Sequence, residues 1–231
     1  VYKRQIYSRA IGLLFALSLL CVGCENEDIL DINDLEISPS NPESVIIVEP
    51  DDGITSVNAL TRAINENGDA TYILRRDGVY YMEGKNVFKH NVVIKAENGS
   101  GKMPIIQPIC DAQGALNADM IRLEGSATFE NIYIIGKDAA TGNLMQRLFR
   151  IDESNVRLKF DHCFIDHCRN FCIRTDNVNN KIYLNNSTIR NLALTSDPAN
   201  GRLIDSRGNE QDSIVTVYYT HLRDHETGRN L

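Results

Sequence analysis

The chain has 231 residues and a formal net charge of −7 at pH 7. No lysine- or arginine-rich run offsets this acidity, so we expect no nucleic-acid partner, because binding phosphates requires a basic surface. The length suits one extended domain with a leader segment, and we expect a monomer.

The two ends of the chain resemble translated sequencing adapter. Residues 1–5 read VYKRQ, and residues 217–227 read VYYTHLRDHET. We therefore assign residues 1–5 and 217–231 to adapter and exclude them from fold reasoning. On this interpretation the native chain is truncated at its C-terminus, and His221 and His225 are not candidate ligands or bases.

A hydrophobic run, AIGLLFALSLL, occupies residues 10–20. As a helix it would rise about 16 Å, roughly half of a hydrocarbon core, so it predicts a signal peptide over residues 6–23 and not a membrane span. The run ends in LCVGC, which resembles a lipobox and implies that Cys24 is lipidated; an ordinary cleaved signal peptide is the alternative. The acidic residues after Cys24 resemble the export signal of bacterial surface lipoproteins. This resemblance implies a lipid anchor in the outer membrane and exposure on the cell surface.

Residues 24–44 are rich in Asp, Glu, Asn, Ser and Pro, and this composition predicts an acidic flexible tether. A helix follows within residues 55–68, TSVNALTRAINENG. We expect Ser or Thr to cap it, Val57, Leu60 and Ile64 to lie on one face, and Asn67 and Gly68 to end it. Short runs of alternating apolar and polar residues come next and predict β-strands.

Beyond residue 119 the strand-like runs repeat. Four of them, IRLE, FRID, IRTD and IDSR, begin at residues 121, 149, 173 and 204. Each is followed by a second run: FENIYI from Phe129, FDHCFI from Phe160, LNNSTI from Leu184, and IVTV, in which Val215 takes the corresponding place. A repeat of this length made of short strands without a helix is typical of a parallel β-helix. We therefore predict an all-β, parallel β-helix domain over residues 45–216, incomplete at its C-terminal end.

The second set of runs predicts columns of stacked side chains. Inward columns would include Ile134, Ile165 and Ile189. Another column, Asn131, His162 and Asn186, predicts a tight turn in which His162 is structural. Beside it, Cys163, Cys168 and Cys172 are most simply buried thiols. Disulfides or a zinc site are the alternatives for these cysteines.

The segment before the first strands carries the pattern LxxAIxxxGDxxxLxxGxY, with its fixed residues at Leu60, Ala63, Ile64, Gly68, Asp69, Leu74, Gly78 and Tyr80. Together with the repeat, this pattern resembles the pectate-lyase-like superfamily. The resemblance implies a right-handed parallel β-helix with an N-terminal capping helix, here in a bacterial surface lipoprotein. It implies little about activity, because the superfamily contains lyases, hydrolases, esterases and surface proteins of unassigned function.

The first set of runs places charged residues in two adjacent outward columns. One column holds Arg122, Arg150, Arg174 and Asp205, and the next holds Glu124, Asp152, Asp176 and Arg207. Each column alone carries charges that are mostly of one sign. We therefore expect residues of one column to pair with oppositely charged residues of the neighbouring column. The exchange of signs at Asp205 and Arg207 preserves that pairing.

Three interpretations of these eight residues remain open. They form a solvated charge ladder, a polysaccharide-binding face whose arginines hold acidic groups of the sugar, or a catalytic site. For a lyase the candidate bases are Arg150 and Arg174, with Ca²⁺ on the carboxylates; for a glycosidase the candidates are Asp152 and Asp176. We favour polysaccharide binding, leave open whether the protein is an enzyme, and keep a structural or adhesive surface protein as a further alternative.

Overall fold

A computed structural model describes the backbone of residues 44–194, 196–207, 214–218 and 221–223, and side chains as far as residue 207. The predicted signal peptide, Cys24 and nearly all of the predicted tether lie outside the described residues. No helix among the described residues combines the length and the apolar character needed to cross a membrane.

The described chain is all-β and forms three sheets in which every strand pairing is parallel. Sheet A contains β1 (Val45–Val48), β2 (Ala70–Leu74), β5 (Val92–Ala96), β8 (Ala127–Glu130), β11 (Arg157–Asp161), β14 (Lys181–Asn185) and β17 (Ile214–Tyr218). Sheet B contains β3 (Val79–Glu83), β6 (Ile105–Ile109), β9 (Tyr133–Ile135), β12 (Phe164–Asp166), β15 (Thr188–Arg190) and β18 (His221–Arg223). Sheet C contains β4 (Val87–Phe88), β7 (Asp119–Leu123), β10 (Arg147–Ile151), β13 (Phe171–Thr175) and β16 (Arg202–Ser206). The helical segments are α2 (Ala59–Asn67) and a short 3-10 turn, η2 (Pro198–Asn200).

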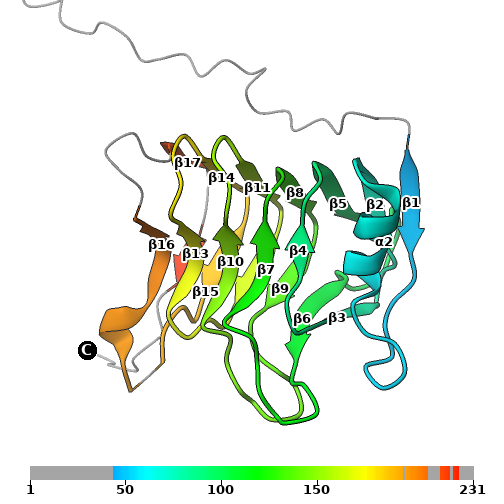
Figure 1. The fold of residues 1–231 in the computed structure, drawn as a ribbon, viewed down its shortest axis with the longest axis horizontal. Coiled ribbons are helices and arrows are strands. Elements are labelled where there is room, and N and C mark those ends of the chain that lie inside the picture. Colours follow the sequence, from blue (N-terminus) through cyan, green and yellow to red (C-terminus); the bar gives the residue numbers. More distant parts are fainter. Residues whose placement is uncertain (1–43, 195, 208–213, 219–220, 224–231) are drawn as a thin grey trace, which may run out of the picture. The chain divides into compact units, whose positions relative to one another are not determined.

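From β7 onward the chain visits the sheets in a fixed order, C then A then B, and starts again (Figure 1). Each predicted repeat therefore contributes one strand to each sheet. The first set of runs stacks in the predicted register, with Arg122, Arg150, Arg174 and Asp205 paired in succession. This arrangement is compatible with a parallel β-helix.

The core is made of inward side chains that stack from strand to strand. Phe129 and Phe160 stack with their ring centroids 5.4 Å apart, and Phe149 meets both rings edge-on. All three rings are fully buried, and burial of such a side chain contributes about 1.5–3 kcal/mol. The predicted column of Ile134, Ile165 and Ile189 is confirmed by the register of sheet B and by burial.

The predicted turn column is also confirmed. Asn131, His162 and Asn186 have φ angles of 57°, 52° and 47°, in the left-handed region that Asn and His adopt more readily than most residues. His162 therefore serves the backbone turn, with its ring beside the Asp161 carboxylate at 2.8 Å.

The four described cysteines carry free thiols. Cys163, Cys168 and Cys172 are buried, and burial raises the pKa of Cys163 and of Cys168 to about 12. The Sγ atom of Cys168 donates to the carbonyl of Phe171 at 2.7 Å. These thiols fill the core, as the simplest interpretation predicted.

Two local predictions were wrong. The N-cap position of helix α2 is Asn58, in a left-handed conformation and without a side-chain cap hydrogen bond, and not Ser or Thr. The carboxylate of Asp51 accepts from the backbone N–H of Ala59 at 3.1 and 3.2 Å, so a distant side chain replaces the local cap. The predicted end at Gly68 is confirmed, and Leu60 and Ile64 are buried, but Val57 precedes the helix and does not share its face.

The second error concerns the last repeat. Leu184 pairs with Val217, and Val215 pairs with Ile182, so Val215 does not take the place assigned to it. The residue that pairs with Leu184 comes two residues later in the chain than predicted. Strand β17 also continues to Tyr218, across the boundary drawn at residue 216.

Candidate functional site

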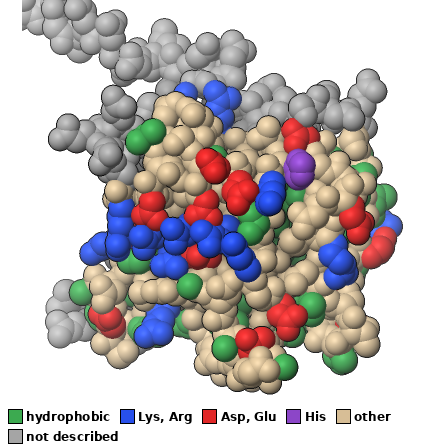
Figure 2. All heavy atoms as spheres, in the orientation of Figure 1, with side chains coloured by type: hydrophobic (Ala, Val, Ile, Leu, Met, Phe, Trp, Pro, Cys, Tyr) green, Lys and Arg blue, Asp and Glu red, His purple; other side chains and the backbone are tan. Residues whose placement is uncertain are grey.

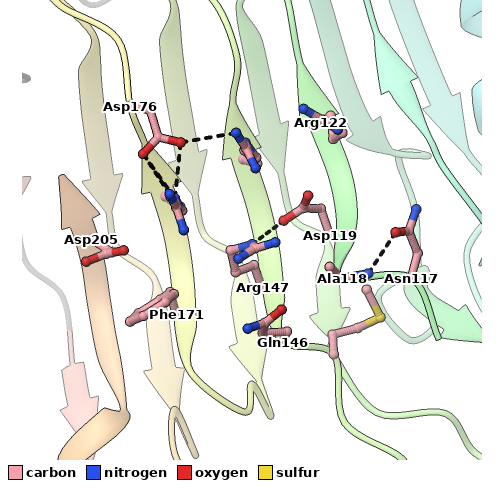
Figure 3. A network of polar contacts seen from close by, with 12 residues as sticks. Asn117, Ala118, Asp119, Arg122, Gln146, Arg147, Phe171, Asp176 and Asp205 are labelled. Atoms are coloured by element: carbon pink, nitrogen blue, oxygen red, sulfur yellow. Dashed lines mark hydrogen bonds and ion pairs between the residues drawn. The ribbon is translucent and has the colours of Figure 1, made fainter. Parts of the chain in front are cut away.

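Five of the predicted charged residues form a continuous ion-pair network on sheet C: Arg122, Asp152, Arg150, Asp176 and Arg174. Arg122 Nε donates to Asp152 Oδ2 at 2.5 Å, and Arg150 Nε forms an ion pair with the same carboxylate, 2.8 Å from Asp152 Oδ1. Arg150 Nη2 also lies 3.2 Å from Asp176 Oδ2, and Arg174 Nη2 lies 3.0 Å from Asp176 Oδ1. Each aspartate thus joins arginines of two neighbouring strands, as Figure 3 shows for Asp176.

The exchange of signs in the last repeat preserves pairing, as predicted. Asp205, whose side chain is only 6% exposed, accepts from Arg207 at 2.9 Å and from Arg202 at 3.4 Å. Glu124 is exposed, and its charge contributes after that of Asp152 to raising the pKa of Arg122. All eight predicted residues therefore belong to one surface.

Sequence reasoning missed a further column on the same strands, which begins two residues before the predicted runs. It contains Asp119, Arg147, Phe171 and Arg202. Arg147 and Asp119 form an ion pair between side chains that are 10% and 6% exposed. The signal was present in the six-residue runs DMIRLE, RLFRID, FCIRTD and RLIDSR.

A pocket of about 700 Å³ opens where the strands of sheet C begin. It is formed by residues of four connections that lead from sheet B to sheet C, at 110–118, 136–146, 167–170 and 191–201. Figure 3 shows Asn117 and Gln146 next to Asp119 and Arg147, so the pocket adjoins the charged columns.

The pocket lining combines amides with aliphatic side chains. The amide side chains are those of Asn117, Asn143, Gln146 and Asn170. The aliphatic side chains include Leu116, Leu144 and Leu194. Amides donate to and accept from hydroxyl groups, and leucines cover the apolar faces of a ring. No sequence pattern predicted this pocket, because the four connections share neither length nor motif.

The residues expected to hold Ca²⁺ do not fit that role. Both carboxylate oxygens of Asp152 and both of Asp176 already lie in ion pairs with arginine, whereas Ca²⁺ takes six to eight oxygen ligands. Within the described residues, no group of three or more His, Cys, Asp or Glu side chains is placed to hold a metal ion.

The four candidate catalytic residues, Arg150, Arg174, Asp152 and Asp176, lie together in the network. Each would have to leave an ion pair before it could act as a base, an acid or a nucleophile. Side chains held in ion pairs suit a rigid binding surface better than they suit proton transfer.

No protein-family model matches the chain, and no curated protein matches it in sequence. The class of protein is therefore defined by the fold and the surface: parallel β-sheets with a charged outer face and a pocket at its edge.

Proposed function

We propose that the outer face of sheet C, together with the adjoining pocket, binds polysaccharide. The observation that carries this proposal is the amide- and leucine-lined pocket at the start of strands β7, β10 and β13. A carbohydrate offers hydroxyl groups to the amides and C–H faces to the leucines. The charged columns extend the surface along the strands.

The charge of this face supports the proposal. The chain carries a formal net charge of −7, yet on the three outward columns of sheet C arginines outnumber carboxylates. Figure 2 shows a band of Lys and Arg side chains with carboxylates among them. Such a face does not repel an acidic polysaccharide as the rest of the chain would.

We further propose that the three sheets form a right-handed parallel β-helix of the pectate-lyase-like type, with α2 as its cap. The fixed order in which the chain visits the sheets supports this, and so does the position of α2 beside β1 and β2 (Figure 1). A crystal structure of the full chain would test it, and strands that returned antiparallel or left-handed would refute it.

We also propose that the protein is presented on the outer membrane by a lipid on Cys24. The support is the hydrophobic run, the lipobox-like LCVGC and the acidic residues after it. Metabolic labelling with a fatty-acid analogue should mark the wild type but not Cys24→Ala. Labelling retained in that variant would refute the anchor.

The binding proposal is tested with a glycan array probed by the full chain. The double variant Gln146→Ala, Asn170→Ala should weaken binding about tenfold or more, because each amide hydrogen bond contributes about 0.5–1.5 kcal/mol. The control is Asn98→Ala, an exposed amide in the connection between β5 and β6. Binding unchanged in the double variant, or no glycan bound by the wild type, contradicts the proposal.

A further inference from the structure

The pocket holds an arginine that differs from its neighbours on sheet C. Arg169 is exposed, and its side chain makes no hydrogen bond or ion pair with any described residue. Every other arginine whose side chain is described takes part in a hydrogen bond, an ion pair or another interaction. Among the residues that the structure describes, Arg169 is therefore the unpaired arginine of this surface.

The backbone holds Arg169 firmly at the pocket. Its N–H donates to the carbonyl of Met145 at 2.8 Å, and the N–H of Asn170 donates to the carbonyl of Gln146 at 3.2 Å. The preceding residue, Cys168, is fully buried. The guanidinium thus projects from an anchored turn and not from a long unsupported loop.

The surroundings of Arg169 suit an anion. Among the described residues that line the pocket, Arg169 is the one with a charged side chain. The side-chain amides of Gln146 and Asn170 are likewise unbonded to any described residue. An anionic group therefore meets a guanidinium here without competition from a carboxylate, whereas Arg150 and Arg174 are already paired with aspartates.

We propose that this pocket binds an anionic substituent of the carbohydrate, a carboxylate or a sulfate ester, with Arg169 donating to its oxygens. The planar guanidinium matches two oxygens of either group. Gln146 and Asn170 donate to or accept from neighbouring hydroxyl groups. The inference rests on the proposed carbohydrate binding. It assigns the anionic group of the carbohydrate to the pocket, whereas the sequence had suggested the arginines of the ion-pair network.

The test compares oligosaccharides that differ only in charge, by calorimetry with the full chain. One pair is a uronate oligosaccharide and its carboxyl-reduced form, and the other is a sulfated oligosaccharide and its desulfated form. The wild type should bind the charged member of at least one pair more tightly, and the pair that responds identifies the anionic group. Arg169→Gln should weaken binding of that charged member about 10- to 100-fold and leave its neutral counterpart within about twofold.

Two further variants sharpen the test. Arg169→Lys keeps the positive charge but loses the planar guanidinium that can donate to two oxygens at once. Its affinity for the charged member should therefore lie between those of Arg169→Gln and the wild type. Arg62→Gln, on helix α2 with a half-exposed side chain, is the matched control and should bind as the wild type does.

The outcomes separate the two proposals. If charged and neutral members bind equally well, or if Arg169→Gln weakens both members equally, the anion site is refuted while carbohydrate binding stands. If neither member of either pair binds the wild type, and the glycan array is also blank, both proposals fail.

Discussion

Arg122 on β7 pairs with Asp152 of the next repeat, with 2.5 Å between Nε and Oδ2. Sideways pairing within one repeat would instead have joined Arg122 to Glu124. The observed pair crosses from one repeat to the next, so the charged columns connect neighbouring strands as well as neighbouring columns. The side chains are 26% and 16% exposed, which limits the energy of the pair.

The Arg122–Asp152 pair should contribute modestly to stability. A double-mutant cycle with Arg122→Ala and Asp152→Ala should give a coupling energy of about 0.5–1 kcal/mol, because partly exposed pairs remain screened by water. Urea unfolding of the four proteins measures it. Glu124→Ala, a substitution at an exposed residue, should change the free energy of unfolding by less than about 0.5 kcal/mol. A coupling energy near zero would argue against the network as a link between repeats.

The buried pair of Arg147 and Asp119 should behave differently. Arg147→Met leaves the Asp119 carboxylate buried without its cation, so it should lower the free energy of unfolding by about 3–5 kcal/mol. The double variant Arg147→Met, Asp119→Leu should recover most of that loss, since it removes both charges. Urea unfolding measures the loss. If Arg147→Met lowers the free energy of unfolding by less than about 1 kcal/mol, water must reach the Asp119 carboxylate.

The Asp166 carboxylate should make stability depend on pH. Burial by itself raises the pKa of Asp166, but hydrogen bonds from Arg190 and Asn191, with the charge of His167 and a bond from Tyr133, lower it below its ordinary value. A lowered pKa in the folded state contributes stability that is present above the unfolded pKa, about 4, and is lost as pH falls through the folded pKa.

The free energy of unfolding should therefore fall below about pH 4, and fall less steeply in Asp166→Asn. Denaturant unfolding across this pH range measures both slopes. Glu153→Gln, at an exposed residue of the connection between β10 and β11, should keep the wild-type slope. Equal slopes in wild type and Asp166→Asn would show that other carboxylates dominate.

The buried cysteines should resist alkylation. Burial raises the pKa of Cys163 and of Cys168 to about 12 and that of Cys172 well above its ordinary value, and the thiolate is the reactive form. Peptide mapping after iodoacetamide at neutral pH should therefore find Cys110, which is partly exposed, modified before these three. Urea should abolish the difference, and rapid native labelling of Cys163 would contradict the packing.

The sequence predicted the parts of this fold in which every repeat carries the same pattern of residue types. The runs from Ile121, Phe149 and Ile173 revealed the register because apolar and charged residues alternate within them. The left-handed turn at Asn131, His162 and Asn186 was visible because few residue types adopt that conformation.

The remaining features depended on contacts that no short pattern contains. Strict alternation of inward and outward side chains would place Asp119 on the inward face, together with Ile121. Met120 and Ile121 are both buried, so the alternation fails here, and the column of Asp119 could not be predicted from it. The cap of α2 comes from Asp51, eight residues before Ala59. The pocket arises where four unlike connections meet, and Arg169 is distinguished only by the partner that it lacks among the described residues.

The sharing of each aspartate between two strands has a consequence for how such a protein can lengthen. Repeats that begin FRID and IRTD each bring one arginine and one aspartate to the surface, and the aspartate reaches back to the repeat before it. A duplicated repeat would therefore insert its own arginine and aspartate into this series of shared ion pairs. Each added repeat would also add a connection at the edge where the pocket opens, so the charged face and the pocket would lengthen together.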